Sequence, residues 1–269
     1  MLRPGKNIRN GLYVLTAIAV IGGAGWLKYK NLEPERDPDS LCSASENGQT
    51  IILVDKTDLW SDAQANRLED HIWWLIAHVM RQEERLHIFT FNDVFQPGFP
   101  PTFSFCKPPS GDAANNITQS KAYYNREYKK QFVQPLKSVL ENIKKAEEKD
   151  CSPIVEVLFD ILTRSEIMNH GGPTRIVMIS DLAQNSSLYS FYQTTKCRRR
   201  PAGVDPRYDT KDIERFIRDR AYAFKDRQIS VIVFQVFPQK NPPYISQAVK
   251  EKWPDFFQFF GIVPDWQLL

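Results

Sequence analysis

The sequence predicts an α/β fold: a Rossmann-like, doubly wound, mostly parallel sheet with helices on both faces, preceded by one transmembrane helix. Short apolar runs typical of strands alternate along the chain with segments of helical periodicity. Two of these runs, residues 51–54 and 176–180, lead directly into aspartates, Asp55 and Asp181. Open α/β sheets place their ligands at the carboxyl ends of parallel strands, so these aspartates mark the expected binding edge.

Length and charge limit the possible functions. The chain has 269 residues, 42% of them hydrophobic, which allows one α/β domain of roughly 200 residues and an appendage. Its 35 basic and 32 acidic residues nearly balance, leaving a net charge of +3. A dedicated nucleic-acid binder carries an excess of basic residues on one face, so no nucleic-acid partner is expected.

The appendage is the N-terminus. Residues 1–10 form a basic flank, and residues 11–27 contain no charged side chain, which is at the short end of the roughly 17 to 25 residues that span a bilayer. We expect a single-pass anchor in the cell (inner) membrane. The basic residues on its two flanks are similar in number, so the free amino group, the lack of acids before the span and the coherent cysteine pairing favour a soluble domain in the periplasm. A cleaved signal peptide remains the alternative, because Gly22 and Ala24 are small residues suited to precede a cleavage site.

Residues 28–48 are polar and predict a linker, and the folded domain is expected over residues 49–269. After the first strand, Ser61 and Gln64 have the spacing of a capping box, so a helix should begin near Asp62. A second strand is expected at residues 86–91. A short aromatic run between prolines at residues 103–105 favours an edge strand.

The second half of the chain continues the alternation. Residues 117–149 have a helical pattern that Pro135 should kink or break. Ser152 and Pro153 are typical of a helix start, with Ser152 as the cap. An amphipathic helix should precede a strand at residues 229–236, and an aromatic tail at residues 244–261 needs a surface to bury it.

Three short stretches resemble the von Willebrand factor A-like (vWFA) family. They are the strand ending in Asp55-Lys56-Thr57, the segment that opens a helix at Ser152, and the strand ending at Asp181. The resemblance covers roughly residues 50–261. It implies a metal-ion-dependent adhesion site in degenerate form, because Leu59 stands where the family has a hydroxyl residue.

The resemblance implies that Asp55, Thr57, Ser152 and Asp181 hold a divalent cation, and Mg²⁺ is the ion expected. Such hard cations take oxygen ligands and leave positions for water and for a partner's carboxylate. Asp58 and Ser61 are possible auxiliary ligands. Alternatively, Asp55 and Asp181 are strand-end residues that only cap the turns after them.

The four cysteines are even in number, which suits a disulfide framework. In the expected fold, Cys42 and Cys106 lie at the end of the sheet opposite the metal site, whereas Cys151 and Cys197 lie in loops at the site. Those two pairings are therefore the coherent ones, and buried free thiols are the alternative.

These observations favour a membrane-anchored, non-enzymatic module that binds a protein partner with the help of a metal ion, as a component of a membrane-associated complex. A metal-dependent hydrolase using the same carboxylates is one alternative. The loops near the site contain no histidine to act as a general base, which counts against it. A structural module with a decayed metal site is the other alternative.

Overall fold

The computed structural model describes residues 16, 18–23, 26, 35–44, 47–57, 60–113, 120–145, 148–193, 195–197, 210–237 and 242–269. Its centre is a six-stranded sheet in the order β3-β2-β1-β4-β5-β6. The strands are β1 (Gln49–Asp55), β2 (Arg85–Phe91), β3 (Phe103–Cys106), β4 (Thr174–Ser180), β5 (Ile229–Gln235) and β6 (Asp265–Leu268).

All strand pairs are parallel except β2 with β3, which is an antiparallel edge pair. The order 3-2-1-4-5-6 is that of the doubly wound α/β sheet, in which the direction of winding reverses between β1 and β4. The predicted mostly parallel α/β sheet is therefore confirmed. The predicted edge strand is confirmed as β3, one residue longer than expected.

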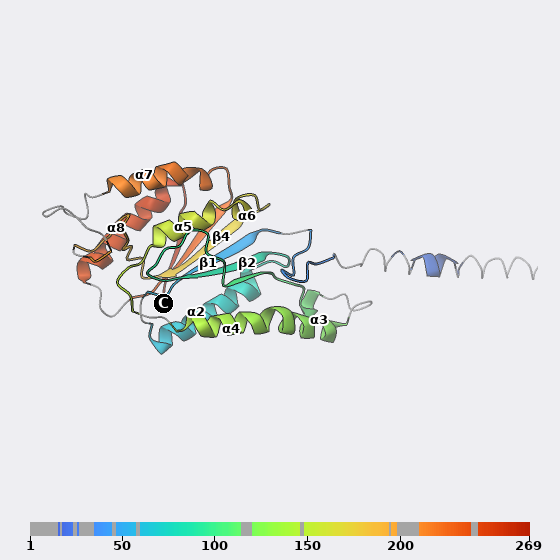
Figure 1. Cartoon of the computed structure of the whole chain (residues 1–269). Coiled ribbons are helices and arrows are strands. Elements are labelled where there is room, and N and C mark those ends of the chain that lie inside the picture. Colours follow the sequence, from blue (N-terminus) through green and yellow to red (C-terminus); the bar gives the residue numbers. More distant parts are fainter. Residues whose placement is uncertain are drawn as a thin grey trace, which may run out of the picture.

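Helices cover both faces of the sheet (Figure 1). On one face lie α2 (Asp62–Trp74), the π-helical turn η1 (Leu75–Val79), α3 (Lys121–Tyr128), the π-helical turn η3 (Lys129–Val133) and α4 (Gln134–Ile143). On the other lie α5 (Ile154–Leu162), α6 (Ser165–Met168), α7 (Lys211–Arg220) and α8 (Pro243–Phe259). The structure also describes two 3₁₀ turns, η2 (Gly111–Ala113) and η5 (Ala221–Ala223).

Strand β1 shows how the two cores are built. Ile51 and Leu53 pack into the core under α5 and α8, and Ile52 and Val54 pack into the core under α2 and α4. Side chains alternate along a strand, so a strand covered on both faces needs a continuous apolar run. This is why residues 51–54 contain no polar side chain.

Helix α2 begins as the sequence predicts. Ser61 is its N-cap, and its Oγ accepts a hydrogen bond from the Gln64 backbone N–H over 3.2 Å. The Gln64 side chain in turn accepts from the Ser61 N–H over 3.0 Å, which completes the capping box.

The long helix predicted for residues 117–149 is divided in the structure. Its described part begins at Lys121 after the N-cap Ser120, and a π-helical turn separates α3 from α4. Pro135 lies in the first turn of α4, where its missing N–H costs least. Residues 117–119 and 146–147 of the prediction lie outside the described residues.

The predicted role of Ser152 as a helix cap is wrong. Pro153 occupies the N-cap position of α5 and makes no side-chain cap bond, and the Gln184 Oε1 from the loop after β4 instead accepts from the Val155 N–H over 2.9 Å. Ser152 forms an isolated antiparallel bridge with Asn185, and its hydroxyl points elsewhere, to Asp55. The helix begins one residue later than the sequence predicts, so Ser152 precedes the N-cap, and its hydroxyl donates to the buried Asp55 carboxylate.

The aromatic tail is mostly the helix α8, which buries Trp253 and Phe257 against the sheet. Phe259 is an exception, since it remains 63% exposed. The sequence did not predict β6, which pairs with β5 as a parallel edge strand. Four residues are too few to show a clear period.

Both predicted disulfides are confirmed. Cys42 bonds to Cys106 with their Cα atoms 4.8 Å apart, and Cys151 bonds to Cys197 with theirs 5.7 Å apart. Cys106 pairs with Arg85, the first residue of β2, so the first bridge lies at the amino edge of the sheet. Disulfides persist in oxidising compartments, and this pair indicates that the domain resides in one.

Part of the predicted linker belongs to the folded structure. Residues 36 and 43 form a bridge, and Leu41 is buried in the core under α2. Of the predicted anchor at residues 11–27, the structure describes only 16, 18–23 and 26, which are helical. Within the residues described, no helix is long and apolar enough to cross a bilayer. The anchor stays a prediction.

Candidate functional site

Asp55 is the centre of a hydroxyl cluster at the carboxyl edge of the sheet. It is the last residue of β1 and is 1% exposed. Its Oδ1 accepts hydrogen bonds from the Thr57 backbone N–H over 3.0 Å and from the Thr57 Oγ1 over 2.6 Å. Its Oδ2 accepts from the Ser152 Oγ over 2.6 Å and from the Ser180 Oγ over 2.9 Å. Two donors therefore point at each carboxylate oxygen.

Three separate segments supply these donors. Thr57 lies in the turn directly after β1, where the side chain of Asp55 closes an Asx-type turn. Ser152 is held by two backbone hydrogen bonds to Asn185, of 2.7 and 2.8 Å. Ser180 is the last residue of β4, and it lies next to Asp55 because Val54 pairs with Ile179. The cluster thus joins β1, β4 and the start of α5.

Asp181 follows Ser180 at the same edge and is 5% exposed. Its Oδ1 accepts a hydrogen bond from the Ala183 N–H over 2.8 Å, which turns the chain after β4. Leu182, within that turn, has a positive φ of 63°. Of the four residues expected to bind metal, the structure links Asp55, Thr57 and Ser152 by hydrogen bonds, and it places Asp181 directly after the strand that supplies Ser180.

The two auxiliary candidates have different outcomes. Asp58 lies outside the described residues, as does Leu59. Ser61 is described, and its side chain is engaged with Gln64 in the capping box of α2.

Burial raises the pKa of the Asp55 carboxyl above its usual range, and the hydrogen bonds from Ser152, Thr57 and Ser180 act in the opposite direction. A carboxylate removed from water is costly unless donors or a cation offset its charge. The cluster provides the donors.

The residue types fit a hard cation. Thr57 and Ser152 each donate their single hydroxyl proton to Asp55, so the remaining lone pairs of both oxygens point away from it. Asp181 adds a second carboxylate. Among the described residues there is no group of three or more His, Cys, Asp or Glu side chains that would hold a metal, so such a site would depend on hydroxyl oxygens.

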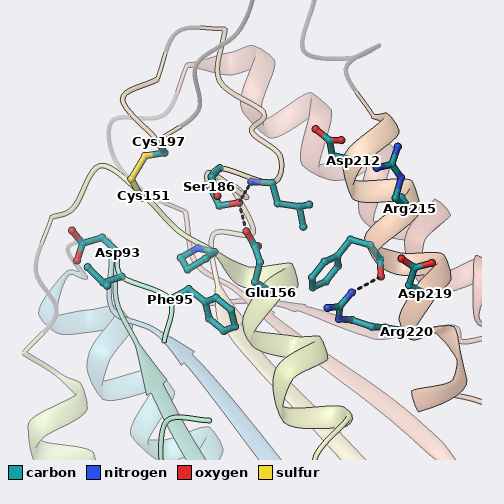
Figure 2. A pocket seen from close by; sticks show the side chains of 15 residues that line it. Asp93, Phe95, Cys151, Glu156, Ser186, Cys197, Asp212, Arg215, Asp219 and Arg220 are labelled. Atoms are coloured by element: carbon teal, nitrogen blue, oxygen red, sulfur yellow. Dashed lines mark hydrogen bonds between the residues drawn. A yellow bond between two sulfur atoms is a disulfide. The ribbon is translucent and has the colours of Figure 1, made fainter. Parts of the chain in front are cut away.

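A cavity of about 770 Å³ adjoins the cluster (Figure 2). Its walls come from the loop after β2 around Asp93, the first turn of α5, residues 186–188 after β4, and α7. The Cys151–Cys197 disulfide lies at its rim. Cys151 and Pro153 line the cavity, so Ser152 between them connects it to the cluster around Asp55.

Glu156 projects from α5 into the middle of this cavity (Figure 2). It is 7% exposed, and it accepts hydrogen bonds from the Ser186 Oγ and, over 2.9 Å, from the Gln184 Nε2. Burial raises the pKa of the Glu156 carboxyl, while the hydrogen bonds from Ser186 and Gln184 lower it. A buried acid in a cavity is a common feature of functional sites.

Sequence reasoning missed Ser180 and Glu156. Ser180 was visible as a polar residue before Asp181, but nothing local says that it lies beside Asp55. Glu156 left a clearer signal, because it is an acid inside the otherwise apolar stretch 154–159 of the helix. Charged residues are seldom fully buried unless they are paired, so an acid on the buried face of a helix is a signal that can be read from the sequence.

No protein-family model matches the sequence, and no curated protein matches it. Among solved structures, the human COPII-coat protein Sec24c is similar with 13% identity and a TM-score of 0.39, over 83% of this chain and 29% of that one. The N-terminal domain of TFIIH p34 is similar with 7% identity and a TM-score of 0.28, over 76% and 95% of the two chains. The chain thus spans less than a third of Sec24c. Likenesses this weak assign neither a family nor a function.

Proposed function

We propose that this chain is a vWFA-like module that binds a protein partner at the carboxyl edge of its sheet, as a component of a complex, and performs no catalysis there. The proposal rests on one observation: the Asp55 cluster lies where the winding of the sheet reverses, beside a large cavity. Ligands of doubly wound sheets bind in the crevice at this point.

The state of Asp55 supports binding over hydrolysis. A nucleophile or general base needs a lone pair directed at the substrate. Each oxygen of Asp55 already accepts two hydrogen bonds, and the side chain is buried. All four histidines of the chain are described, and none of them lines the cavity.

We further propose that Mg²⁺ assists this binding, with Thr57, Ser152 and Asp181 supplying oxygens and Asp55 orienting both hydroxyls. A bound Mg²⁺ would supply an open coordination position for a carboxylate of the partner. A cluster that has lost its metal is the competing proposal. It is favoured by Leu59 in the sequence and by the low exposure of Thr57 and Ser152, 3% and 6%.

Calorimetric titration of the full chain with Mg²⁺ decides between the two. Saturable heat at millimolar Mg²⁺ that disappears in Asp181→Ala supports the metal site. Asp70→Asn, at an exposed position on α2, is the control and should keep the heat. No heat in the wild type, or equal heat in Asp181→Ala, supports the metal-free cluster.

We place the domain in the periplasm, anchored to the inner membrane by residues 11–27. The disulfides support an oxidising compartment, and the uncharged segment with its basic flank supports the anchor. External protease added to intact spheroplasts should digest the domain. A domain that survives until the membrane is broken would lie inside the cell, against this proposal.

Site-specific photo-crosslinking tests the binding edge itself. Val94 lines the cavity and is 60% exposed, so a benzophenone side chain at this position should give one defined protein adduct in intact membranes. Trp74 on α2 is 56% exposed and serves as the matched control. Equal adducts from both positions, or none from Val94, would contradict binding at this edge.

A further inference from the structure

The charges around the cavity are unevenly distributed. The α7 wall is balanced, with Asp212 and Asp219 against Arg215 and Arg220. Among the residues that the structure describes, the opposite wall, from the loop after β2 and the first turn of α5, contains Asp93 and Glu156 and no basic residue. The negative surplus of the described lining therefore lies on the wall formed by the β2 loop and α5, which Figure 2 shows facing α7.

The Asp93 carboxylate on this wall can accept hydrogen bonds from a ligand. Asp93 is half-buried, and its carboxylate has no hydrogen-bond or ion-pair partner among the residues that the structure describes. Glu156 accepts one side-chain hydrogen bond on each oxygen, and a carboxylate oxygen has about two acceptor positions. Both carboxylates can therefore accept further hydrogen bonds from a ligand.

Aromatic rings stand beside both groups of charges. Across the cavity, the Arg220 guanidinium lies 3.8 Å from the centroid of the Phe216 ring, so one ring of the cavity already has a cation on its face. Phe95 is the corresponding ring on the acidic wall, two residues after Asp93, and it is partly buried. Aromatic faces attract guanidinium and ammonium groups. On the acidic wall, however, no cation of the described chain fills this place.

We propose that this cavity binds an arginine or lysine side chain of the protein partner, between Asp93, Phe95 and Glu156. The inference rests on the proposed function, because it takes the ligand to be part of a protein. The surplus of carboxylates on one wall, the partnerless acid and the adjacent ring fit the charge, the donors and the flat or elongated shape of such a side chain. An anionic side chain would meet two carboxylates there.

The probes are N-acetyl-arginine amide and N-acetyl-lysine amide, added to the isotope-labelled full chain in detergent and followed by NMR. We expect saturable shifts of the backbone amides of Val94, Glu156 and Ser187. N-acetyl-glutamate amide tests the opposite charge, and N-acetyl-norleucine amide tests the apolar chain without the charge. Neither should give saturable shifts at these amides.

Two substitutions test the acids. Asp93→Asn and Glu156→Gln keep the size of each side chain and should each weaken binding of the basic probes about tenfold or more, since each removes the negative charge from a charge-assisted hydrogen bond. Asp70→Asn removes an exposed carboxylate outside the cavity and should leave binding unchanged. Because Asp93 lies in a surface loop, its variant tests the proposal even if Glu156→Gln fails to fold.

Tighter binding of the glutamate probe, equal binding of norleucine, or unchanged affinity in Asp93→Asn would each overturn the proposal. A specific crosslink from Val94 without any binding of basic probes would contradict recognition of a cationic side chain and still support a partner site at this edge. Binding of basic probes without a crosslink would instead contradict the proposal that a protein partner binds here. The two proposals therefore fail in different experiments.

Discussion

The Ser180 hydroxyl at the end of β4 donates a hydrogen bond of 2.9 Å to the Asp55 carboxylate at the end of β1. The same Ser180 Oγ accepts from the Leu182 N–H over 2.9 Å, so it connects the strand end to the turn that follows. The Asp55–Ser180 hydrogen bond links the ends of β1 and β4 at the point where the winding of the sheet reverses. The binding edge is therefore built on a buried and fully hydrogen-bonded carboxylate.

Replacing Asp55 by alanine should destabilise the fold strongly, because the Thr57, Ser152 and Ser180 hydroxyls would lose a shared acceptor. Each buried polar group left without a partner costs about 1 to 3 kcal/mol, so a loss of about 3 kcal/mol or more is expected. Ser180→Ala removes one donor to Asp55 and the acceptor of the Leu182 N–H, and it should cost about 1 to 2 kcal/mol. Ser230→Ala, at an exposed position in β5, should change little. Urea unfolding measures all three, and equal values for Asp55→Ala and Ser180→Ala would contradict the shared role.

The two disulfides should contribute similarly to stability and differently to binding. They close loops with sequence separations of 64 and 46 residues, which in the chain-entropy model stabilise by about 4 kcal/mol each. Replacing either pair by alanines should lower stability by up to this amount in thermal or urea unfolding. Only loss of Cys151–Cys197, which lies at the rim of the cavity, should also reduce the crosslink from Val94. A crosslink that depends equally on Cys42–Cys106 would speak against a local effect.

His87 should make the fold sensitive to mild acid. Burial lowers its pKa from 6.5 to about 3, and the positive charges of Arg85, His170 and Arg164 act in the same direction. Its Nδ1 also shares a hydrogen bond of 3.1 Å with the Ser104 hydroxyl. Because the folded-state pKa is depressed, unfolded His87 takes up a proton first. The stability present above pH 6.5 is lost as pH falls toward 3.

At pH 5 this protonation should cost about 2 kcal/mol relative to neutral pH. Chemical denaturation at pH 7.5 and pH 5 measures the difference in unfolding free energy. In His87→Gln the difference should shrink by about that amount, whereas in His78→Gln, at an exposed residue, it should match the wild type. An unchanged difference in His87→Gln would show that other groups carry the acid sensitivity.

Ser61 should contribute to the stability of the fold by capping the start of α2. Ser61→Ala removes the acceptor of the Gln64 N–H and should cost about 1 kcal/mol, the usual value for an N-cap. Ser61→Asp supplies another good cap and should restore most of the loss. If Ser61→Ala instead abolished a Mg²⁺ signal in the wild type without changing stability, Ser61 would belong to the metal site.

Local patterns were sufficient where the structure depends on neighbours in sequence. The apolar run before Asp55 predicted a strand covered on both faces, and the spacing of Ser61 and Gln64 predicted a helix start to within one residue. The disulfides were also predictable, because the sheet separates its two ends by a full strand length and only cysteines at the same end can meet. Local spacing and strand direction are enough for such predictions.

The site was only partly predictable because its partners come from separate strands. Ser180 meets Asp55 through the register of β1 and β4, and a shift of one residue would turn Ser180 to the other face. For Ser152, the sequence predicted a helix cap, but α5 begins one residue later and the Ser152 hydroxyl donates to Asp55 from a distant strand. Neither outcome follows from the residues next to these serines.

By itself, the sequence determined the alternation of strands and helices, the strand-end aspartates and the pairing of the cysteines. The tertiary structure decided which hydroxyls converge on Asp55, that Glu156 projects into a cavity, and that both charged side chains described on one wall of this cavity are acidic. The physical reason is that hydrophobic periodicity is a local property of the chain, whereas register, burial and hydrogen-bond choice depend on segments more than 90 residues apart, as with Asp55 and Ser152, separated by 97.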